Sequence, residues 1–373
     1  MRALALNCGS SSLKFALVET DDGERLLSGA EEIAAGGHEA ALDAVVERLG
    51  SQPELAQGLE GIGHRVVHGG ETFRDSVRID ARVMAGIEAV SPMAPLHNPI
   101  NLLGIRRLGD AFPGLPQVAV FDTAFHQALP PRAYLYALPR SLHAEHGVRR
   151  YGFHGTSHRY LAQEAIRRFE LPAEKSRIVT AHLGNGCSTA AVLAGRSVET
   201  SMGFSPLEGL VMGTRSGDVD PGLHAYLAER LGLDLAGVTR LLNNESGLLG
   251  LSGISADVRR LEAAEAEGNA DAALALEIFC YRLARQVASL QVPLGGLDAL
   301  IFSGGIGENS ARIRAQVLEW LEPLGFEMDP EANANHGRDT NGMIGRSGPP
   351  FAGVVSTDEE LLIALDTARV LGG

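Results

Sequence analysis

The chain has 373 residues and a formal net charge of −14 at pH 7, with 45% hydrophobic and 21% charged residues. This length exceeds one typical domain core, so we expect two domains in an ordinary globular protein. The negative charge argues against nucleic acid or an anionic membrane as a partner. No apolar run approaches the ~18 residues of a membrane span, and the N-terminus lacks a signal peptide's apolar core. Three widely spaced cysteines indicate a reducing compartment, so we expect a cytoplasmic protein.

Strand and helix signals alternate along nearly the whole chain, which predicts an α/β fold. We expect strands at 2–7, 13–19, 61–68, 117–122, 177–183, 187–193, 298–303 and 352–356. We expect helices at 39–50, 80–91, 98–110, 157–169, 220–231, 234–243, 269–291, 309–322 and 357–371. Asn98 and Asp220 each precede a proline and predict helix caps, and Ser356 with Glu359 predicts a capping box.

A weak internal repeat relates residues 4–18 to residues 179–193. Each stretch has an apolar strand, a polar residue (Asn7 or His182), a glycine-containing polar turn and a second apolar strand. The spacing of about 175 residues favours two related domains. A coincidence between two hairpins accounts for the pattern equally well.

Three turns have the residues of a phosphate cradle. The turn at 7–14 adds serine hydroxyls and Lys14, one of only two lysines among 32 basic residues, to its backbone N–H groups. The turns "HLGNG" (182–186) and "SGGIGEN" (303–309) let the backbone approach a ligand, and the second opens a helix. An ordinary hairpin or a glycine-dependent connection would account for each turn alone, and none is a Walker A loop.

Arginine and acidic residues also stand in ligand-like positions. Arg65 and Arg215 lie beside glycines, where a guanidinium binds carboxylate or phosphate with two prongs, although most arginines are surface residues. Asp122 ends an apolar strand, where α/β folds place ligand crevices, and a helix cap is the alternative. His154 and His158 fit roles as ligands, acids or hydrogen-bond donors. No cysteine or third histidine joins them at the spacing of a metal site, and a lone histidine is usually structural.

Taken together, these motifs resemble those of the acetate kinases, which belong to the superfold of acetate and sugar kinases, heat-shock proteins and actin. The resemblance covers nearly the whole chain and is carried by "NCGSSSLKF", "GHRVVHGGE", "PLHNP", "VFDTAFH", "RRYGFHGTSH", "HLGNGCS", "TSMGFSPLEGLVMGTRSGDVDPG", "FSGGIGENS" and "STDEEL". It implies two duplicated actin-like, ribonuclease H-like α/β domains with a nucleotide cleft between them. We expect one lobe at 1–122 plus 357–373 and the other at 123–356.

The resemblance also implies a set of site residues. Asp122, His154 and Arg215 would be catalytic, and Asn7 and Glu359 would lie at Mg²⁺, with Mn²⁺ as the alternative metal. Acetate would contact Arg65, with its methyl group among Val67, Leu96, Phe153 and Pro206. ATP or ADP would contact Ser10, Ser12, Lys14, His182, Leu183, Gly184, Asn185, Gly186, Asp257, Val258, Arg259, Gly305, Ile306, Gly307, Glu308 and Asn309.

Three of these residues also fit ordinary structural roles. Glu359 fits the third helical position of a capping box, which leaves Glu360 as the alternative metal ligand. Asp257 follows Ser255 in a helix first turn, where acidic residues are favoured anyway. Val67 fits the core of a sheet.

The implied reaction is the reversible phosphorylation of acetate by ATP, through direct in-line transfer, to acetyl phosphate and ADP. A carboxylate is already ionised at pH 7, since its pKa is near ~4–5, and needs no general base. We therefore expect Asp122 to orient an arginine or a metal-bound water. Propionate or butyrate kinases of the same family, and an actin-like ATP-driven switch, are the alternatives. The family suggests a homodimer.

Overall fold

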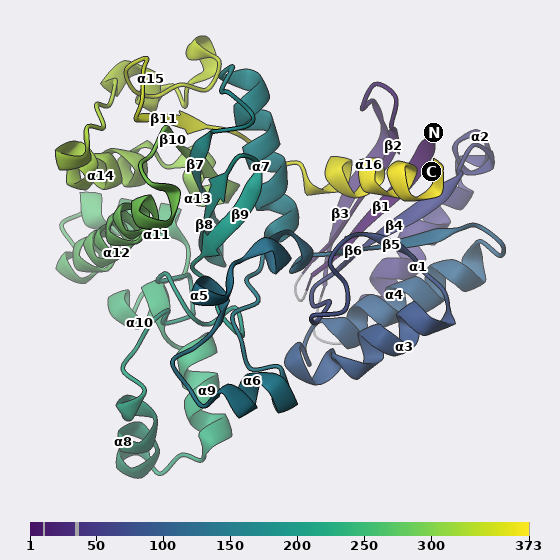
Figure 1. Ribbon diagram of the computed structural model, residues 1–373, viewed down its shortest axis with the longest axis horizontal. Coiled ribbons are helices and arrows are strands. Elements are labelled where there is room, and N and C mark those ends of the chain that lie inside the picture. Colours follow the sequence, from purple (N-terminus) through teal and green to yellow (C-terminus); the bar gives the residue numbers. More distant parts are fainter. Residues whose placement is uncertain (10–11, 34–36, 373) are drawn as a thin grey trace. The chain divides into compact units, whose positions relative to one another are not determined.

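The computed structural model describes residues 1–9, 12–33 and 37–372 (Figure 1). The chain forms two compact units. The first contains Met1–Gln127, His154–Tyr160 and Asp358–Gly373, and the second contains Ala128–Phe153 and Leu161–Thr357. The expected domain boundaries, after residue 122 and before residue 357, stay a prediction.

The first unit contains a six-stranded sheet in the order β3-β2-β1-β4-β6-β5. Strands β1, β2 and β3 pair antiparallel, β1, β4 and β6 pair parallel, and β5 is antiparallel to β6. The strands are β1 (Arg2–Cys8), β2 (Ser12–Glu19), β3 (Arg25–Glu32), β4 (Gly61–Val66), β5 (Val77–Arg78) and β6 (Gln117–Phe121). The helices are α1 (His38–Gly50), α2 (Pro53–Gln57), α3 (Ala81–Ala89), η1 (Ser91–Met93), α4 (Asn98–Ala111), η2 (Ala124–Ala128) and α16 (Glu359–Gly372).

The alternation of side chains along β1 and β2 builds two cores, one on each face of this sheet. Large residues such as Leu4, Leu6 and Phe15 pack with α1 and α4. Alanines on the other face pack against α16, which lies across the strands in Figure 1. Gly63 lets α16 come close, since a Cβ there would lie 2.2 Å from Thr367 Oγ1.

The second unit contains a five-stranded sheet in the order β11-β10-β7-β8-β9. Its strands are β7 (Arg177–Leu183), β8 (Cys187–Leu193), β9 (Arg196–Thr200), β10 (Ala299–Ser303) and β11 (Phe351–Val354). Helix α7 (Gly155–Arg168) begins in the first unit and ends in the second. The other helices are α5 (Pro131–Tyr134), α6 (Arg140–His146), α8 (Gly222–Leu231), α9 (Leu235–Asn244), α10 (Gly247–Ser252), α11 (Val258–Ala266), α12 (Ala270–Leu294), α13 (Gly304–Asn309), α14 (Ala311–Leu321), η3 (Glu322–Leu324), α15 (Pro330–Ala334) and η4 (Arg338–Thr340).

The two sheets share one topology. Strands β3-β2-β1-β4-β6 of the first correspond in order and direction to β9-β8-β7-β10-β11 of the second. Asn7 pairs with Lys14 in one hairpin, and His182 pairs with Ser188 in the other. The internal repeat therefore reflects two similar domains, and the expected fold class is confirmed.

Several local predictions differ from the structure. Asn98 is not the cap of α4, because its Oδ1 accepts a hydrogen bond from His68 N at 3.0 Å. The capping box at Ser356 is wrong as well, since Asp358 Oδ1 accepts from Leu361 N at 2.9 Å and caps α16. Strands β3, β5 and β9 were not predicted: β3 is a largely exposed edge strand, and β5 and β9 have only two and five residues. The short helices α2, α5, α6, α10 and α15 were not predicted either. Asp220 Oδ1 accepts a hydrogen bond from Gly222 N, at the start of α8, at 2.7 Å, but the N-cap position itself is occupied by Pro221.

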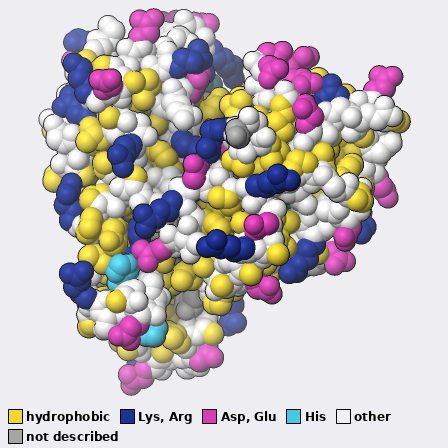
Figure 2. All heavy atoms as spheres, turned by 45° about the vertical axis from the view of Figure 1, so that its right-hand side comes forward, with side chains coloured by type: hydrophobic (Ala, Val, Ile, Leu, Met, Phe, Trp, Pro, Cys, Tyr) yellow, Lys and Arg dark blue, Asp and Glu magenta, His cyan; other side chains and the backbone are white. Residues whose placement is uncertain are grey.

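Among the described residues, none of the helices combines the length and the apolar character that crossing a membrane requires. On the face shown in Figure 2, basic and acidic side chains are interspersed, with apolar side chains between them.

Candidate active site

Polar side chains from three neighbouring strands of the first unit meet at the carboxyl edge of its sheet. Arg65 lies on β4, Asp122 directly follows β6, and Asn7 lies near the end of β1. Arg65 Nη2 donates to Asp122 Oδ2 at 2.8 Å, and Nη1 donates to Asn7 Oδ1 at 3.3 Å. Parallel strands bring such residues together because their carboxyl ends share one edge, where ligands bind in open α/β sheets.

The Asp122 carboxylate is buried, with 1% of the residue's surface exposed. Besides Arg65, it accepts hydrogen bonds from the backbone N–H groups of His154 at 2.8 Å and Thr156 at 3.5 Å. Burial alone would raise its pKa, but the Arg65 charge and these donors outweigh burial and hold the pKa below its usual value. Asp122 is therefore an ionised anchor.

His154 has a left-handed backbone conformation, with φ of 55°, which is uncommon for a residue with a side chain. The next residue, Gly155, donates its N–H to Asp122 O at 2.9 Å, and a Cβ there would lie 2.2 Å from that oxygen. The close approach requires glycine, and it fixes the backbone that carries His154. Such strain is retained where the surroundings determine it, often at functional sites.

Two glutamates at the start of α16 face Asn7. Asn7 Nδ2 donates to Glu359 Oε2 at 2.8 Å and to Glu360 Oε1 at 3.4 Å. Glu359 is the first residue of the helix, and because Asp358 supplies the cap, the capping role considered for Glu359 is wrong. Burial raises the pKa of both glutamates, and the Glu359 charge raises that of Glu360 further, whereas Arg65 and Lys14 act in the opposite direction.

This group of oxygens fits a hard divalent cation. The described residues contain no group of three or more His, Cys, Asp or Glu side chains arranged to hold a metal alone. Mg²⁺ does not require one, since it commonly takes one or two carboxylates and completes its shell with water and phosphate. A bound cation would also relieve the unfavourable burial of Glu359 and Glu360. Asn7, Glu359 and Glu360 are thus the residues that could hold it.

The turn at residues 7–14 is described in part. Lys14 pairs with Asn7 in the hairpin register, has an exposed side chain, and interacts electrostatically with both glutamates. Ser12 begins β2. Ser10 lies outside the described residues.

In the second unit, Arg215 sits in a loop held by backbone hydrogen bonds. Met212 N donates to Arg215 O at 3.1 Å, and Leu248 N donates to Met212 O at 2.9 Å. Gly247 has φ of 62°, and a Cβ there would lie 2.3 Å from Met212 O. The Arg215 guanidinium contacts Pro206 O at 3.3 Å and Met212 Sδ at 3.6 Å. Burial lowers its pKa, although Cys187 acts against this. A guanidinium placed in this way is suited to an anion.

The second unit also contains a cavity of about 760 Å³, a size typical of ligand sites. The three motifs expected at ATP meet there, although they are up to 125 residues apart. Its lining residues are Gly184, Asn185, Ala256, Asp257, Val258, Arg259, Glu262, Gly305, Ile306, Asn309 and Ser310.

Among the residues of the second unit expected at ATP, five do not line this cavity: His182, Leu183, Gly186, Gly307 and Glu308. Ser12 and Lys14 belong to the first unit. Glu308 instead holds its own turn, since its Oε1 accepts from Gly304 N at 2.9 Å and Ser303 Oγ at 3.2 Å. Asp257 caps α11, accepting from Arg259 N at 2.9 Å, so the cap and the cavity wall coincide in one residue.

Sequence reasoning missed three lining residues, Ala256, Glu262 and Ser310. A signal existed for Ser310, which follows the glycine turn and caps α14 by accepting from Ile313 N at 3.0 Å. Ala256 and Glu262 carry no distinctive signal, because an alanine before a helix and a glutamate on a helix surface occur in most proteins.

The residues expected around the methyl group are divided between the units. Val67 and Leu96 belong to the first, and Phe153 and Pro206 to the second. Val67 and Phe153 are buried, whereas Leu96 is 71% exposed.

Comparison with known proteins shows the family to which the chain belongs. A family model described as the acetokinase family matches residues 29–365. An acetate kinase of Deinococcus deserti is 53% identical, over 100% of this chain and 98% of that protein. The solved structures of a Francisella tularensis propionate kinase and the Porphyromonas gingivalis acetate kinase are 41% and 40% identical, with TM-scores of 0.91 and 0.90, each over 99% of both chains. The chain therefore belongs to the acetokinase family.

Proposed function

We propose that this protein is an acetate kinase, which reversibly transfers the γ-phosphoryl group of ATP to acetate and forms acetyl phosphate and ADP. One observation supports a carboxylate as the acceptor. The buried Asp122 carboxylate is engaged by Arg65 and two backbone N–H groups, so it is poorly placed to take a proton. A hydroxyl acceptor would need such a base, whereas acetate reacts without one.

The main obstacle to this reaction is the repulsion between acetate and a polyphosphate. Arg65, fixed by Asp122 and Asn7, is suited to hold the acetate carboxylate. Arg215 and His154 would stabilise the charge that develops on the transferred phosphoryl group. The rigid loops that carry both residues keep these donors in place before the reaction, which is how preorganised electrostatics lowers a barrier.

We further propose that Asn7, Glu359 and Glu360 contribute side-chain oxygens to a Mg²⁺ site. Mg²⁺ would neutralise phosphate charge and orient the oxygens of the nucleotide. Lys14, on the neighbouring strand, supplies a further positive charge for the phosphates.

The nucleotide would occupy the cavity lined by residues 184–185, 256–259, 262, 305–306 and 309–310. Its glycines allow close approach to the backbone, and Val258 and Ile306 provide apolar walls for a base. The other five residues expected at the nucleotide would support the lining residues without lining the cavity themselves: His182, Leu183, Gly186, Gly307 and Glu308.

A second candidate, propionate kinase, rests on the 41% identity to the Francisella tularensis enzyme. An apolar pocket distinguishes acids that differ by one methylene by only ~1–3 kcal/mol, so a mixed preference is compatible with one site.

The experiment is an ADP-release assay with and without acetate, in the presence of Mg²⁺ and of hydroxylamine to trap acyl phosphate. Acetate-dependent ADP release with a trapped hydroxamate is expected, and EDTA should abolish both. Repeating the assay with propionate and butyrate ranks the acids by kcat/KM. ADP release that is independent of acetate, without hydroxamate, would instead support an ATP-driven switch. Sedimentation and fractionation test the expected homodimer and cytoplasmic location.

A further inference from the structure

Arg314, on α14, is a fully buried arginine, with 0% of its surface exposed. Burying a guanidinium is unfavourable unless its N–H groups all find acceptors. Within the described residues, its hydrogen-bond acceptors are backbone oxygens, an amide oxygen and a ring nitrogen, and none is a carboxylate. The buried charge is therefore held by neutral acceptors and forms no ion pair with them.

The contacts of Arg314 join two separate segments. On one side, Nη1 donates to Gly307 O at 2.8 Å and Glu308 O at 3.0 Å, both in α13. On the other side, Nε donates to Asn333 Oδ1 and Nη2 to Asn333 O, each at 2.8 Å, and Nη2 also reaches His336 Nδ1 at 2.9 Å. Asn333 lies in the last turn of α15, and His336 follows the end of that helix.

The α15 side of this link is firmly anchored. Asn333 is 3% exposed, and its Nδ2 donates to Ala311 O at 2.8 Å, at the start of α14. Asp329 caps α15 with hydrogen bonds of 3.0 Å to Glu331 N and Ala332 N. Arg314 therefore attaches α13 to a fixed support.

The α13 side carries part of the nucleotide cavity. This helix has six residues, and Gly305, Ile306 and Asn309 from it line the cavity. A helix of one or two turns is not stable on its own, so its position depends on its neighbours. The Glu308 carboxylate holds its first N–H, at Gly304, while Arg314 holds the carbonyls near its end. The two side chains clamp the turn at both ends.

We propose that Arg314 is a positioning residue for the nucleotide: by fixing α13 against α15, it sets the position of the wall formed by Gly305, Ile306 and Asn309. The inference rests on the proposed function, because it takes this cavity as the nucleotide site. Arg314 does not line the cavity itself, so it acts through α13.

Arginine suits this role because its planar fork presents donors in several fixed directions. Lysine would keep the charge and offer three donors from one atom, so it would serve one segment and leave acceptors on the other without a partner. The Arg314→Lys variant should therefore loosen α13 even though the charge is retained.

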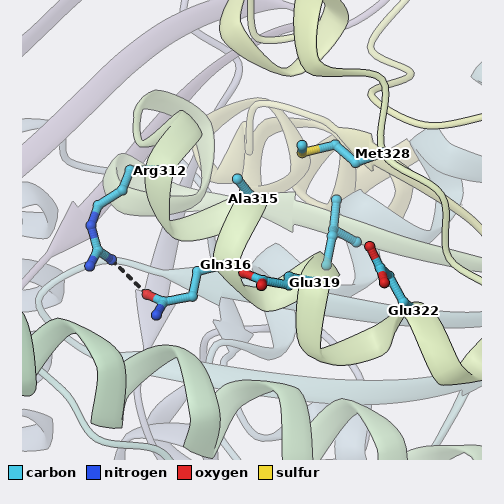
Figure 3. Close-up of a pocket in the computed structure, with 7 residues that line it drawn as sticks. Arg312, Ala315, Gln316, Glu319, Glu322 and Met328 are labelled. Atoms are coloured by element: carbon cyan, nitrogen blue, oxygen red, sulfur yellow. Dashed lines mark hydrogen bonds between the residues drawn. The ribbon is translucent and has the colours of Figure 1, made fainter.

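Arg312→Gln is the matched control. Arg312 lies on the same helix, contacts Gln316 and Glu265, and lines a different cavity of about 480 Å³ (Figure 3). Arg312 forms hydrogen bonds with Glu265 of α11, with Gln316 and with Cys280. The variant therefore leaves the contacts of Arg314 with α13 and α15 in place and shows what the loss of a guanidinium from α14 does by itself.

The test compares Arg314→Lys and the milder His336→Ala with this control, in steady-state assays and in calorimetric titrations with ADP and Mg²⁺. For Arg314→Lys we expect KM for ATP and Kd for ADP to rise about tenfold or more, with KM for acetate unchanged. His336→Ala loses one contact and should show the same pattern with a smaller rise. Circular dichroism reports whether each variant is folded.

The inference is overturned if folded Arg314→Lys and His336→Ala bind ADP as the wild-type protein does. It is also overturned if kcat falls in proportion to the folded fraction while both KM values stay constant, since that result describes a purely structural residue. A wild-type protein that binds ADP but shows no acetate-dependent turnover would contradict the proposed function. In that case, the ADP titration still decides the role of Arg314.

Discussion

Asp122 Oδ2 accepts hydrogen bonds from both the Arg65 guanidinium and the His154 backbone N–H, each at 2.8 Å. One carboxylate oxygen thus fixes the arginine of β4 and the left-handed turn that carries the histidine. The positions of Arg65, proposed for acetate, and of His154, proposed for the transition state, therefore depend on the same buried charge. We propose that Asp122 acts by orienting these groups.

The first prediction concerns Asp122→Asn. The amide keeps the shape but loses the charge that pairs with Arg65, and we expect kcat to fall roughly 10²-fold. Because the pKa of Asp122 is already lowered by Arg65 and the backbone donors despite its burial, its carboxylate stays ionised over the working pH range. The pH profile of the variant should keep the wild-type shape. An acidic limb that is present in the wild type and absent in the variant would identify Asp122 as a general base.

The second prediction concerns Arg215. Removing a charged donor to a transition state commonly costs ~3–4 kcal/mol, so Arg215→Ala should lower kcat roughly 10²-fold or more. Lysine should restore part of the activity, because it returns the charge without the fork. The exposed Arg240, in the same unit, provides the control variant Arg240→Ala. Near-normal turnover of Arg215→Ala would remove this residue from the proposed mechanism.

Much of the first site could be predicted from the ends of strands. Asn7 and Asp122 each occur where an apolar strand meets polar residues, and Arg65 was singled out by the glycines near it. The parallel order of β1, β4 and β6 brings the three to one edge. The internal repeat was visible because each domain uses the same hairpin. The edge strands β3 and β9 gave weak signals, since an exposed strand needs no continuous apolar pattern.

The roles within the site could not be predicted from local sequence. The partners of Asp122 are 57 residues before it and 32 residues after it, and one of them is a backbone N–H. The contact between Asn7 and Glu359 spans 352 residues. Ser356 with Glu359 matched a capping box, but Asp358 competes for the same role and caps the helix, which leaves Glu359 facing the site.

The third prediction separates the two glutamates at the proposed metal. Asn7 contacts Glu359 at 2.8 Å and Glu360 at 3.4 Å, and Arg65 Nε lies 3.9 Å from Glu359. We expect Glu359→Gln to raise the Mg²⁺ concentration for half-maximal activity at least about tenfold, and Glu360→Gln to raise it less. Activity titrations with Mg²⁺ and Mn²⁺ measure both. A larger effect at Glu360 would make it the principal ligand, as the sequence left open.

The fourth prediction concerns stability in acid. His64, on β4, is 3% exposed and contacts Gln117 Oε1 through Nε2 at 2.6 Å. Burial lowers its pKa from 6.5 to about 4, although the hydrogen bond acts against this. Between pH 6.5 and pH 4, His64 is protonated in the unfolded chain but stays neutral in the folded protein. Because protonation of His64 favours the unfolded chain, the free energy of unfolding decreases as the pH falls from 6.5 toward 4. His64 accounts for a decrease of at most about 3 kcal/mol.

The His64→Gln variant cannot take up this proton, so its stability should fall less between pH 6.5 and pH 4 than that of the wild type. Urea unfolding at several pH values in this range, followed by circular dichroism, measures the difference. His146→Gln is the matched control, because the His146 side chain is 65% exposed and its replacement should leave the wild-type slope unchanged. Equal slopes for wild type and His64→Gln would mean that His64 takes up its proton in the folded protein as readily as in the unfolded chain.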